Sequence, residues 1–164
     1  MRTPFFISGS YIRKNYIMTL NELIEDIKEL ALAHDQVTSF HVGNTFDIAT
    51  SKSSERYPAV WFELPILTSY DDRRRKTHQL SLNFLTLAKS DDIDDQISKT
   101  SDMEIIADEM MQAIDDHFQN IGIDGLTGLS LRGFSDDDLV GYRIDLTFTV
   151  GRQCDYRESF DITI

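Results

Sequence analysis

The sequence predicts an α+β domain in which a mostly antiparallel sheet packs against two helices, and three observations favour this fold. Residues 142–150 alternate five apolar with four polar or charged side chains, as expected of a strand with one buried face. Two segments have apolar side chains at helical spacing, and each follows a capping box. Between these helices lie further runs rich in strand-forming residues.

Each predicted helix begins at a capping box, in which a hydroxyl accepts from a backbone amide and a Glu side chain reaches back. Thr19 and Glu22 form the first box, before a helix over Leu20–Ala33. Ser101 and Glu104 form the second, before a helix over residues 102–118. Acidic residues at 102 and 104 suit the positive end of a helix dipole. Both helices are therefore predicted with defined starts.

The strands are predicted from alternation and composition. Residues 59–64 and 80–87 form an antiparallel hairpin whose tip covers residues 69–77, and Pro65 marks an edge, a bulge or a strand end. Residues 40–44 are expected to turn the chain, and Phe46 and Ile48 indicate a short strand. Gly122, Gly125 and Gly128 interrupt the pattern before a strand that begins at residues 129–131. Residues 160–164 are a last alternating segment.

Length and composition indicate one domain. The chain has 164 residues, of which 41% are hydrophobic and 27% charged, which is ordinary for a globular protein with a sizeable core. We assign residues 19–164 to a single α+β domain. Residues 1–18 are interpreted as an N-terminal arm or an over-called start, because Met18 stands directly before the first helix signal.

The net charge of the chain limits the classes of molecule that it is expected to bind. There are 28 Asp and Glu against 16 Lys and Arg, a net charge of −12. The chain as a whole is therefore not expected to bind nucleic acid, which requires cations that neutralise phosphates. Acidity suits a surface that DNA passes without sticking, and equally a protein that is merely soluble. Cys154, the one cysteine, excludes an intramolecular disulfide and a thiolate metal cluster.

Two kinds of residue were considered for metal binding or catalysis. Residues 91–95 are expected to form an acidic loop, which lacks the glycine and the terminal glutamate of an EF-hand; a solvated loop is the favoured interpretation. The four histidines, His34, His41, His78 and His117, form no HExxH pair. His34 and His117 suit helix ends, and His41 and His78 are expected at strand edges. The sequence therefore predicts no enzyme, no cofactor and no metal site.

The candidate subunit interface combines two charged segments. The cations Arg73, Arg74, Arg75 and Lys76 stand at the predicted hairpin tip. They form either a solvated turn or a surface that pairs with the carboxylates of a neighbouring subunit, namely Asp91, Asp92, Asp94 and Asp95. Four cations on an acidic protein are a weak signal for DNA binding.

The element order resembles that of the tail-terminator (tail-completion) proteins of tailed bacteriophages and of neck ring proteins, including those of crAss-like phages. The matching elements are the helix Leu20–Ala33, the strand pair 59–67 and 78–89, the helix 102–118, and the strand 142–150 with its tail at 154–156.

The resemblance implies a structural virion protein at the phage head–tail interface, assembled in the host cytoplasm and not associated with a membrane. It would form a cyclic homo-oligomer, a hexamer or dodecamer, between portal or neck and tail proteins, and DNA would pass its lumen without specific binding. Two alternatives stay open at this point: a monomeric acidic binding or adaptor module, and a small metal-dependent hydrolase or nuclease that uses the aspartate clusters.

Overall fold

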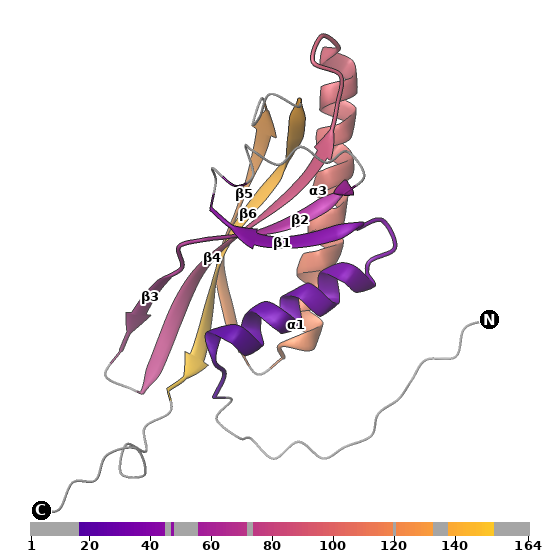
Figure 1. Ribbon diagram of the computed structural model, residues 1–164. Helices are drawn as coiled ribbons and strands as arrows, with labels where there is room; N and C mark the ends of the chain where they lie inside the picture. The colour runs from indigo at the N-terminus through magenta and orange to yellow at the C-terminus, as the bar shows by residue number, and fades with distance from the viewer. Residues whose placement is uncertain are drawn as a thin grey trace, which may run out of the picture.

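A computed structural model describes residues 17–44, 47, 56–71, 74–119, 121–132 and 138–152 (Figure 1). It confirms the α+β class, because six strands form one mostly antiparallel sheet and two helices pack on it. Several sequence predictions fall outside the described residues: the arm up to residue 16, the strand signal at Phe46 and Ile48, Arg73, Cys154, and the segment 160–164.

The elements follow one another as α1 (Leu20–Ala33), β1 (Ser39–Gly43), β2 (Ala59–Glu63), β3 (Leu67–Tyr70), β4 (Arg75–Leu87), α3 (Ile93–His117), β5 (Gly122–Arg132) and β6 (Leu139–Gly151). The strand order is β1-β2-β4-β6-β5. Among the described strands, only β1 and β2 pair in parallel. Strand β3 pairs with the beginning of β4, before the segment that pairs with β2. The two long strands β4 and β6 pair over their whole length, from Arg75 opposite Gly151 to Leu87 opposite Leu139.

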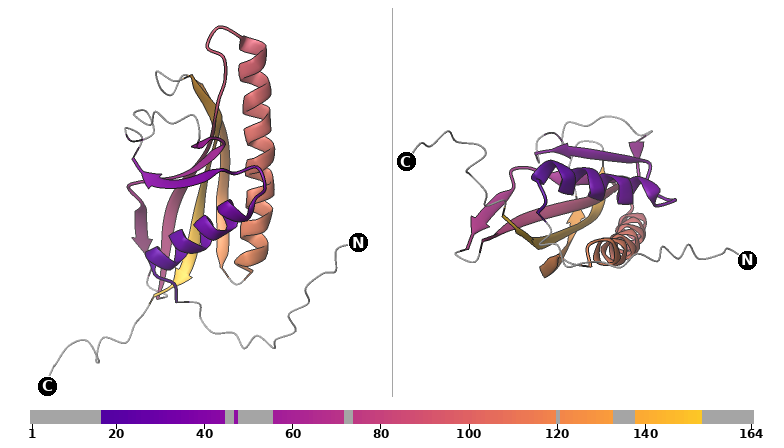
Figure 2. Two further views of the ribbon diagram at one scale, coloured as in Figure 1. Left: turned by 45° about the vertical axis from the view of Figure 1, so that its right-hand side comes forward. Right: turned by 90° about the horizontal axis from the view of Figure 1, so that it is seen from below.

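Both helices contribute to one core on one face of the sheet. In Figure 2, α3 runs along the strands and α1 lies obliquely to them. The core joins three side chains of α1 (Leu23, Ile27, Ala31) to α3 and to alternate residues of the central strands, among them Leu82, Phe84 and Phe148. This alternation places the remaining strand residues on the opposite face, which neither α1 nor α3 covers and which we call the uncovered face. That face has a small apolar cluster of Trp61, Leu85, Leu131 and Leu139 and is otherwise mainly polar.

The first capping box is confirmed. The Thr19 hydroxyl accepts from the Glu22 amide at 3.2 Å, and the Thr19 amide donates to the Glu22 carboxylate at 2.7 Å. These two bonds satisfy amides that the helix itself leaves unpaired.

The predicted start of the second helix is wrong, and so is the predicted acidic loop. Helix α3 begins at Ile93, its N-cap is Asp92, and the Asp92 carboxylate accepts from the Asp95 amide at 3.0 Å. Ser101 and Glu104 therefore lie within the helix. The first turns carry few apolar residues, and both Ile93 and Ile97 are exposed. Apolar periodicity could not reveal turns that bury nothing.

One strand was missed and another was predicted to begin too late, because their signals are not local. Residues 40–44 were predicted to turn, yet Ser39–Gly43 form β1, which pairs in parallel with β2. The predicted glycine-rich break is instead β5, which bulges between Asp124 and Thr127, where Gly125 has φ +68°. Gly128 lies directly beneath the Tyr142 ring, so a β-carbon there would overlap the phenol oxygen.

The hairpin prediction is partly confirmed. Strand β2 does pair with β4, with Val60 opposite Phe84. The hairpin tip, however, belongs to β3 and β4, because β3 ends at Tyr70 and β4 begins at Arg75. The short strand β3 was predicted as the end of one strand and the start of the tip. Its pairing with β4, Thr68 opposite His78, makes the hairpin extend beyond the end of β2.

We predict that Asp92→Ala destabilises the protein by about 1 kcal/mol, since it removes the oxygen that caps α3. Ser101→Ala, the matched control, should change the free energy of unfolding by less than about 0.5 kcal/mol, because Ser101 is exposed within the helix and Ala is a better helix former. Urea unfolding followed by circular dichroism measures both. A larger loss for Ser101→Ala than for Asp92→Ala would contradict the helix start described here.

Candidate functional site

The polar part of the uncovered face contains one connected network across β2, β4 and β6. The Arg143 guanidinium donates to Glu63, Asp145 and the Ser81 hydroxyl, each at 2.8 Å. Ser81 donates in turn to Asp145 at 2.5 Å, and the buried amide of Asn83 donates to Glu63 at 3.1 Å. Three strands are therefore linked through one guanidinium.

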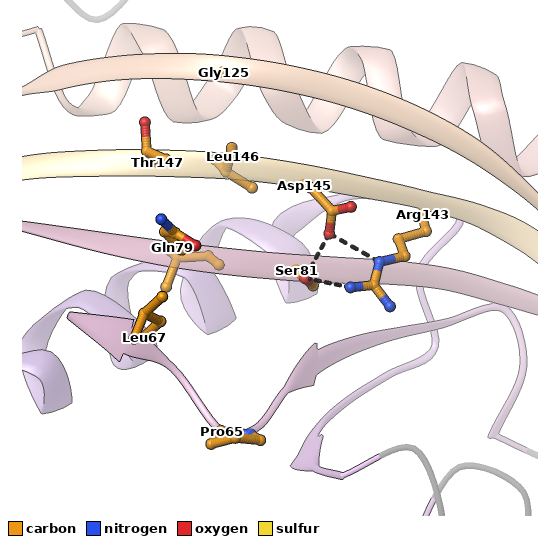
Figure 3. A pocket seen from close by; sticks show the side chains of 10 residues that line it. Pro65, Leu67, Gln79, Ser81, Gly125, Arg143, Asp145, Leu146 and Thr147 are labelled. Carbon is orange, nitrogen blue, oxygen red and sulfur yellow. Dashed lines mark hydrogen bonds and ion pairs between the residues drawn. The ribbon is translucent and has the colours of Figure 1, made fainter. Parts of the chain in front are cut away.

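This network lines one side of a shallow groove of about 420 Å³. Figure 3 shows Arg143, Asp145 and Ser81 pointing toward one another, with Pro65 set apart from them. Two carboxylates surround one guanidinium, so the network carries net negative charge and is not suited to bind an anion. Its geometry suits strand-to-strand linkage, because charge-assisted, multidentate bonds fix the guanidinium plane.

The predicted cations lie at the tip of the β3–β4 hairpin, apart from Arg73, which is outside the described residues. The Arg75 guanidinium binds Asp71 at 2.8 Å. Arg74 has φ +60°, and its carbonyl accepts from the Arg152 amide at 2.8 Å. The Arg152 guanidinium lies 5.5 Å from the centre of the Tyr70 ring, within the range of a cation–π contact. We call Arg74, Arg75, Lys76 and Arg152 the basic tip.

Sequence reasoning missed the place of Arg152 in the basic tip. The residue follows the end of β6, and only the pairing of Arg75 with Gly151 brings it beside the hairpin. No local pattern signals this contact, because the two segments are far apart in the chain.

The structure separates the basic tip from the predicted acidic segment. These groups follow opposite ends of the 13-residue strand β4, which spans roughly 40 Å at about 3.3 Å per residue. Figure 1 shows the hairpin and the beginning of α3 at opposite ends of the molecule. The side chains of Asp92 and Asp95 accept from the backbone amides of Asp95 and Lys89, respectively. Asp91 and Asp94 are exposed.

Two carboxylates of α3, those of Glu104 and Asp108, lie near Tyr142 of β6, and the sequence did not single them out. Burial raises the pKa of the Tyr142 phenol, and the nearby carboxylates of Glu104 and Asp108 raise it further. A side-chain hydrogen bond to Glu104 is a further, smaller cause of the raised pKa of Tyr142. Because the Tyr142 ring lies over Gly128, Glu104 and Asp108 stand close to the middle of β5. This acidic group lies beside an outer strand of the sheet.

The histidines have structural contacts. His34 binds Glu109 at 2.8 Å and His117 lies 3.4 Å from Asp26, so both link α1 to α3. His34 is the C-cap of α1 and His117 is in the last turn of α3, as predicted.

The other two histidines lie on strands. His41 stacks on Trp61 with ring centres 4.8 Å apart. His78 was expected at a strand edge, but it is buried within β4, where its Nδ1 lies 2.7 Å from the Thr68 hydroxyl.

Within the described ranges, no three His, Cys, Asp or Glu side chains converge as metal ligands, and neither helix is long and apolar enough to span a membrane. No family model matches the chain, and no curated protein matches its sequence.

We predict that Arg143→Met lowers the free energy of unfolding by about 2 kcal/mol, because it leaves two partly buried carboxylates without their shared cation. Arg75→Met is the matched control: it also removes a guanidinium bound to a carboxylate, but at an exposed pair worth about 0.5 kcal/mol. Equal losses in urea unfolding would contradict a structural role for the network.

We predict that His78 makes stability pH-dependent. Burial, and then the charge of Lys76, lower the pKa of His78 below its ordinary value of 6.5. The unfolded chain therefore takes up a proton before the folded protein does, so this contribution is complete above pH 6.5 and is lost as the pH falls toward the lowered value. Between pH 7.5 and 5, the free energy of unfolding should fall less steeply in His78→Gln than in the wild type. Parallel profiles would contradict this assignment.

Proposed function

We propose that this protein is a structural subunit that assembles head to tail into a closed ring, and that the ring belongs to the head–tail interface of a tailed phage. One observation carries the assembly: the basic tip lies at one end of a subunit that is otherwise strongly acidic. The acidic turn at the start of α3 is too distant to neutralise the tip of the same subunit. Asp71 of the same subunit pairs with Arg75, and contact with a second copy would add carboxylates to the rest of the tip.

A contact between two different surfaces of identical subunits propagates from copy to copy. It closes into a ring when the rotation between neighbours divides a full turn, and otherwise forms a filament. A hexamer or dodecamer is the expected closed form, in keeping with the resemblance in element order to tail-terminator proteins.

The sheet also favours assembly through its edges. In the described part of the chain, β5 forms one border, and β1 and β3 lie on the other side of β4 and β6. Unpaired edge strands present free amides and carbonyls, which proteins cover or pair. Edges on opposite sides suit a head-to-tail contact, because one subunit then supplies each side.

The surplus of carboxylates suits a ring through which DNA passes, since an acidic lumen repels phosphates and leaves DNA mobile. We place the ring between portal or neck and tail proteins of the virion, with assembly in the host cytoplasm. The rival metal-dependent hydrolase relied on the aspartates at 91–95. Two of these four carboxylates accept from backbone amides at the start of α3, which favours a capping role for them.

We predict that the triple substitution Arg74→Gln, Arg75→Gln and Lys76→Gln weakens self-association at least about tenfold, because it removes desolvated charge pairs between subunits. Native mass spectrometry and light scattering of the full chain measure the oligomer. Rising salt should weaken the wild-type oligomer as well, since it screens exposed charges.

The matched control for the tip variant removes three exposed or partly exposed lysines elsewhere: Lys28→Gln, Lys89→Gln and Lys99→Gln. Both triple variants have the same net charge, so a general effect of charge would alter them equally. The control should assemble like the wild type, and both variants should keep its melting temperature within a few degrees, because surface charges contribute little to folding. Unchanged assembly of the tip variant would remove the tip from the interface.

A further inference from the structure

We infer that the basic tip docks on the β5 edge of a second copy of this chain, beside the Glu104 and Asp108 carboxylates of α3, with β3 added to β5 as a further strand. This inference rests on the proposed assembly and names its acceptor surface. The acceptor differs from the acidic segment at residues 91–95 that the sequence suggested.

Beyond its bulge, the β5 edge lacks the charged side chains and prolines that often keep strand edges apart. Strand β5 pairs with β6 on one side, and its other side is an edge of the sheet formed by the described residues. After the bulge, residues 127–131 read Thr-Gly-Leu-Ser-Leu, without charge or proline. Leu129 is 56% exposed and Leu126 is 59% exposed. An uncharged and partly apolar edge is a template for another strand.

Strand β3 has the matching properties. It pairs with β4 on one side, and its four residues fit the five that follow the bulge in β5. Leu67 and Tyr70 are 62% and 67% exposed, high values for large side chains on a strand. Covering them by a neighbour would remove apolar surface from water.

The faces of the two strands also correspond. Leu67 lies opposite Gln79 and belongs to the uncovered face, as does Leu129, which lies opposite Arg143. Tyr70 lies opposite Lys76, whose partner Val150 is buried under the helices. If the sheet continues from one subunit into the next, Leu67 and Leu129 therefore lie on the same, uncovered face, because neighbouring side chains of paired strands share a face.

The cations of the donor subunit and the carboxylates of the acceptor subunit lie on the same face of the sheet. Tyr70, Lys76 and Arg152 lie toward the helix-bearing face, and Arg152 stacks on Tyr70. Glu104 and Asp108 stand on that face of the acceptor, next to Tyr142 over Gly128. Strand addition thus brings two cations and a phenol hydroxyl to two carboxylates. The turn at residues 91–95 has carboxylates too, but it presents no strand edge.

The first test is Leu129→Lys in the full chain. A lysine at the centre of the edge should abolish the oligomer in native mass spectrometry, because charged side chains block strand addition. Leu32→Lys is the matched control: it makes the same substitution at a 48% exposed leucine on α1 and should assemble like the wild type. Thermal unfolding by circular dichroism checks that both fold. Wild-type assembly of Leu129→Lys would overturn this inference and leave the proposed assembly standing.

The second test mixes two blocked subunits. The triple tip variant keeps an intact β5 edge, whereas Leu129→Lys keeps an intact tip. Each variant alone should be monomeric. In an equimolar mixture, the intact tip of Leu129→Lys can dock on the intact β5 edge of the tip variant. The mixture should therefore form a one-to-one dimer that does not grow, because the two remaining surfaces of this dimer are both blocked. Absence of this dimer would overturn the inference, as would a wild type that forms only two-fold dimers. A wild type that is monomeric at the highest soluble concentration would overturn the inference and the proposed function together.

Discussion

The structure depends on the antiparallel pairing of β4 with β6 along their full length. These strands supply the centre of the core, with Leu82, Phe84 and Phe148 on the face covered by the helices. They also approach each other closely: any side chain at Gly141 would overlap the carbonyl of Phe84. Burial of one continuous apolar face against α1 and α3 is the main stabilising term, since each buried large side chain contributes about 1.5–3 kcal/mol.

The unequal lengths of the strands explain where the charged surfaces lie. Strand β4 has two short neighbours in succession on one side, β3 and then β2. The hairpin therefore extends beyond β2 and carries the basic tip away from the start of α3. On the other side, β6 is covered by the single strand β5. The same pairing that builds the core thus leaves a positive end, an uncharged edge and a polar uncovered face.

The polar network on the uncovered face shows how a sheet with helices on one face only can keep a defined strand register. Arg143 of β6 binds Glu63 of β2 and Ser81 of β4, and these two bonds fix the lateral register of the three strands. Ionic groups that are only partly buried contribute little net stability but penalise misalignment, because a one-residue slip would turn them toward the core. The network therefore complements the apolar face, which supplies most of the stability.

Local patterns in the sequence determined α1, β6, β2 and the cations of the hairpin tip. A capping box, strict alternation and a run of basic residues act over a few positions, so they can be recognised without knowing the fold. The start of α3 was misplaced because its first turns bury almost nothing, while a capping motif inside the helix imitated a start.

Only the tertiary structure decided the pairing of β1, the continuity of β5 through its glycines, and the surfaces built from distant residues. In the sequence, Gly128 is typical of a strand break. In the structure, its missing side chain makes room for the Tyr142 ring. Strand pairing brings Arg152 to Tyr70, and helix packing brings Glu104 and Asp108 near Tyr142. Such contacts connect segments far apart in the chain, and no short pattern records them, because their energy arises from pairing and packing between those segments.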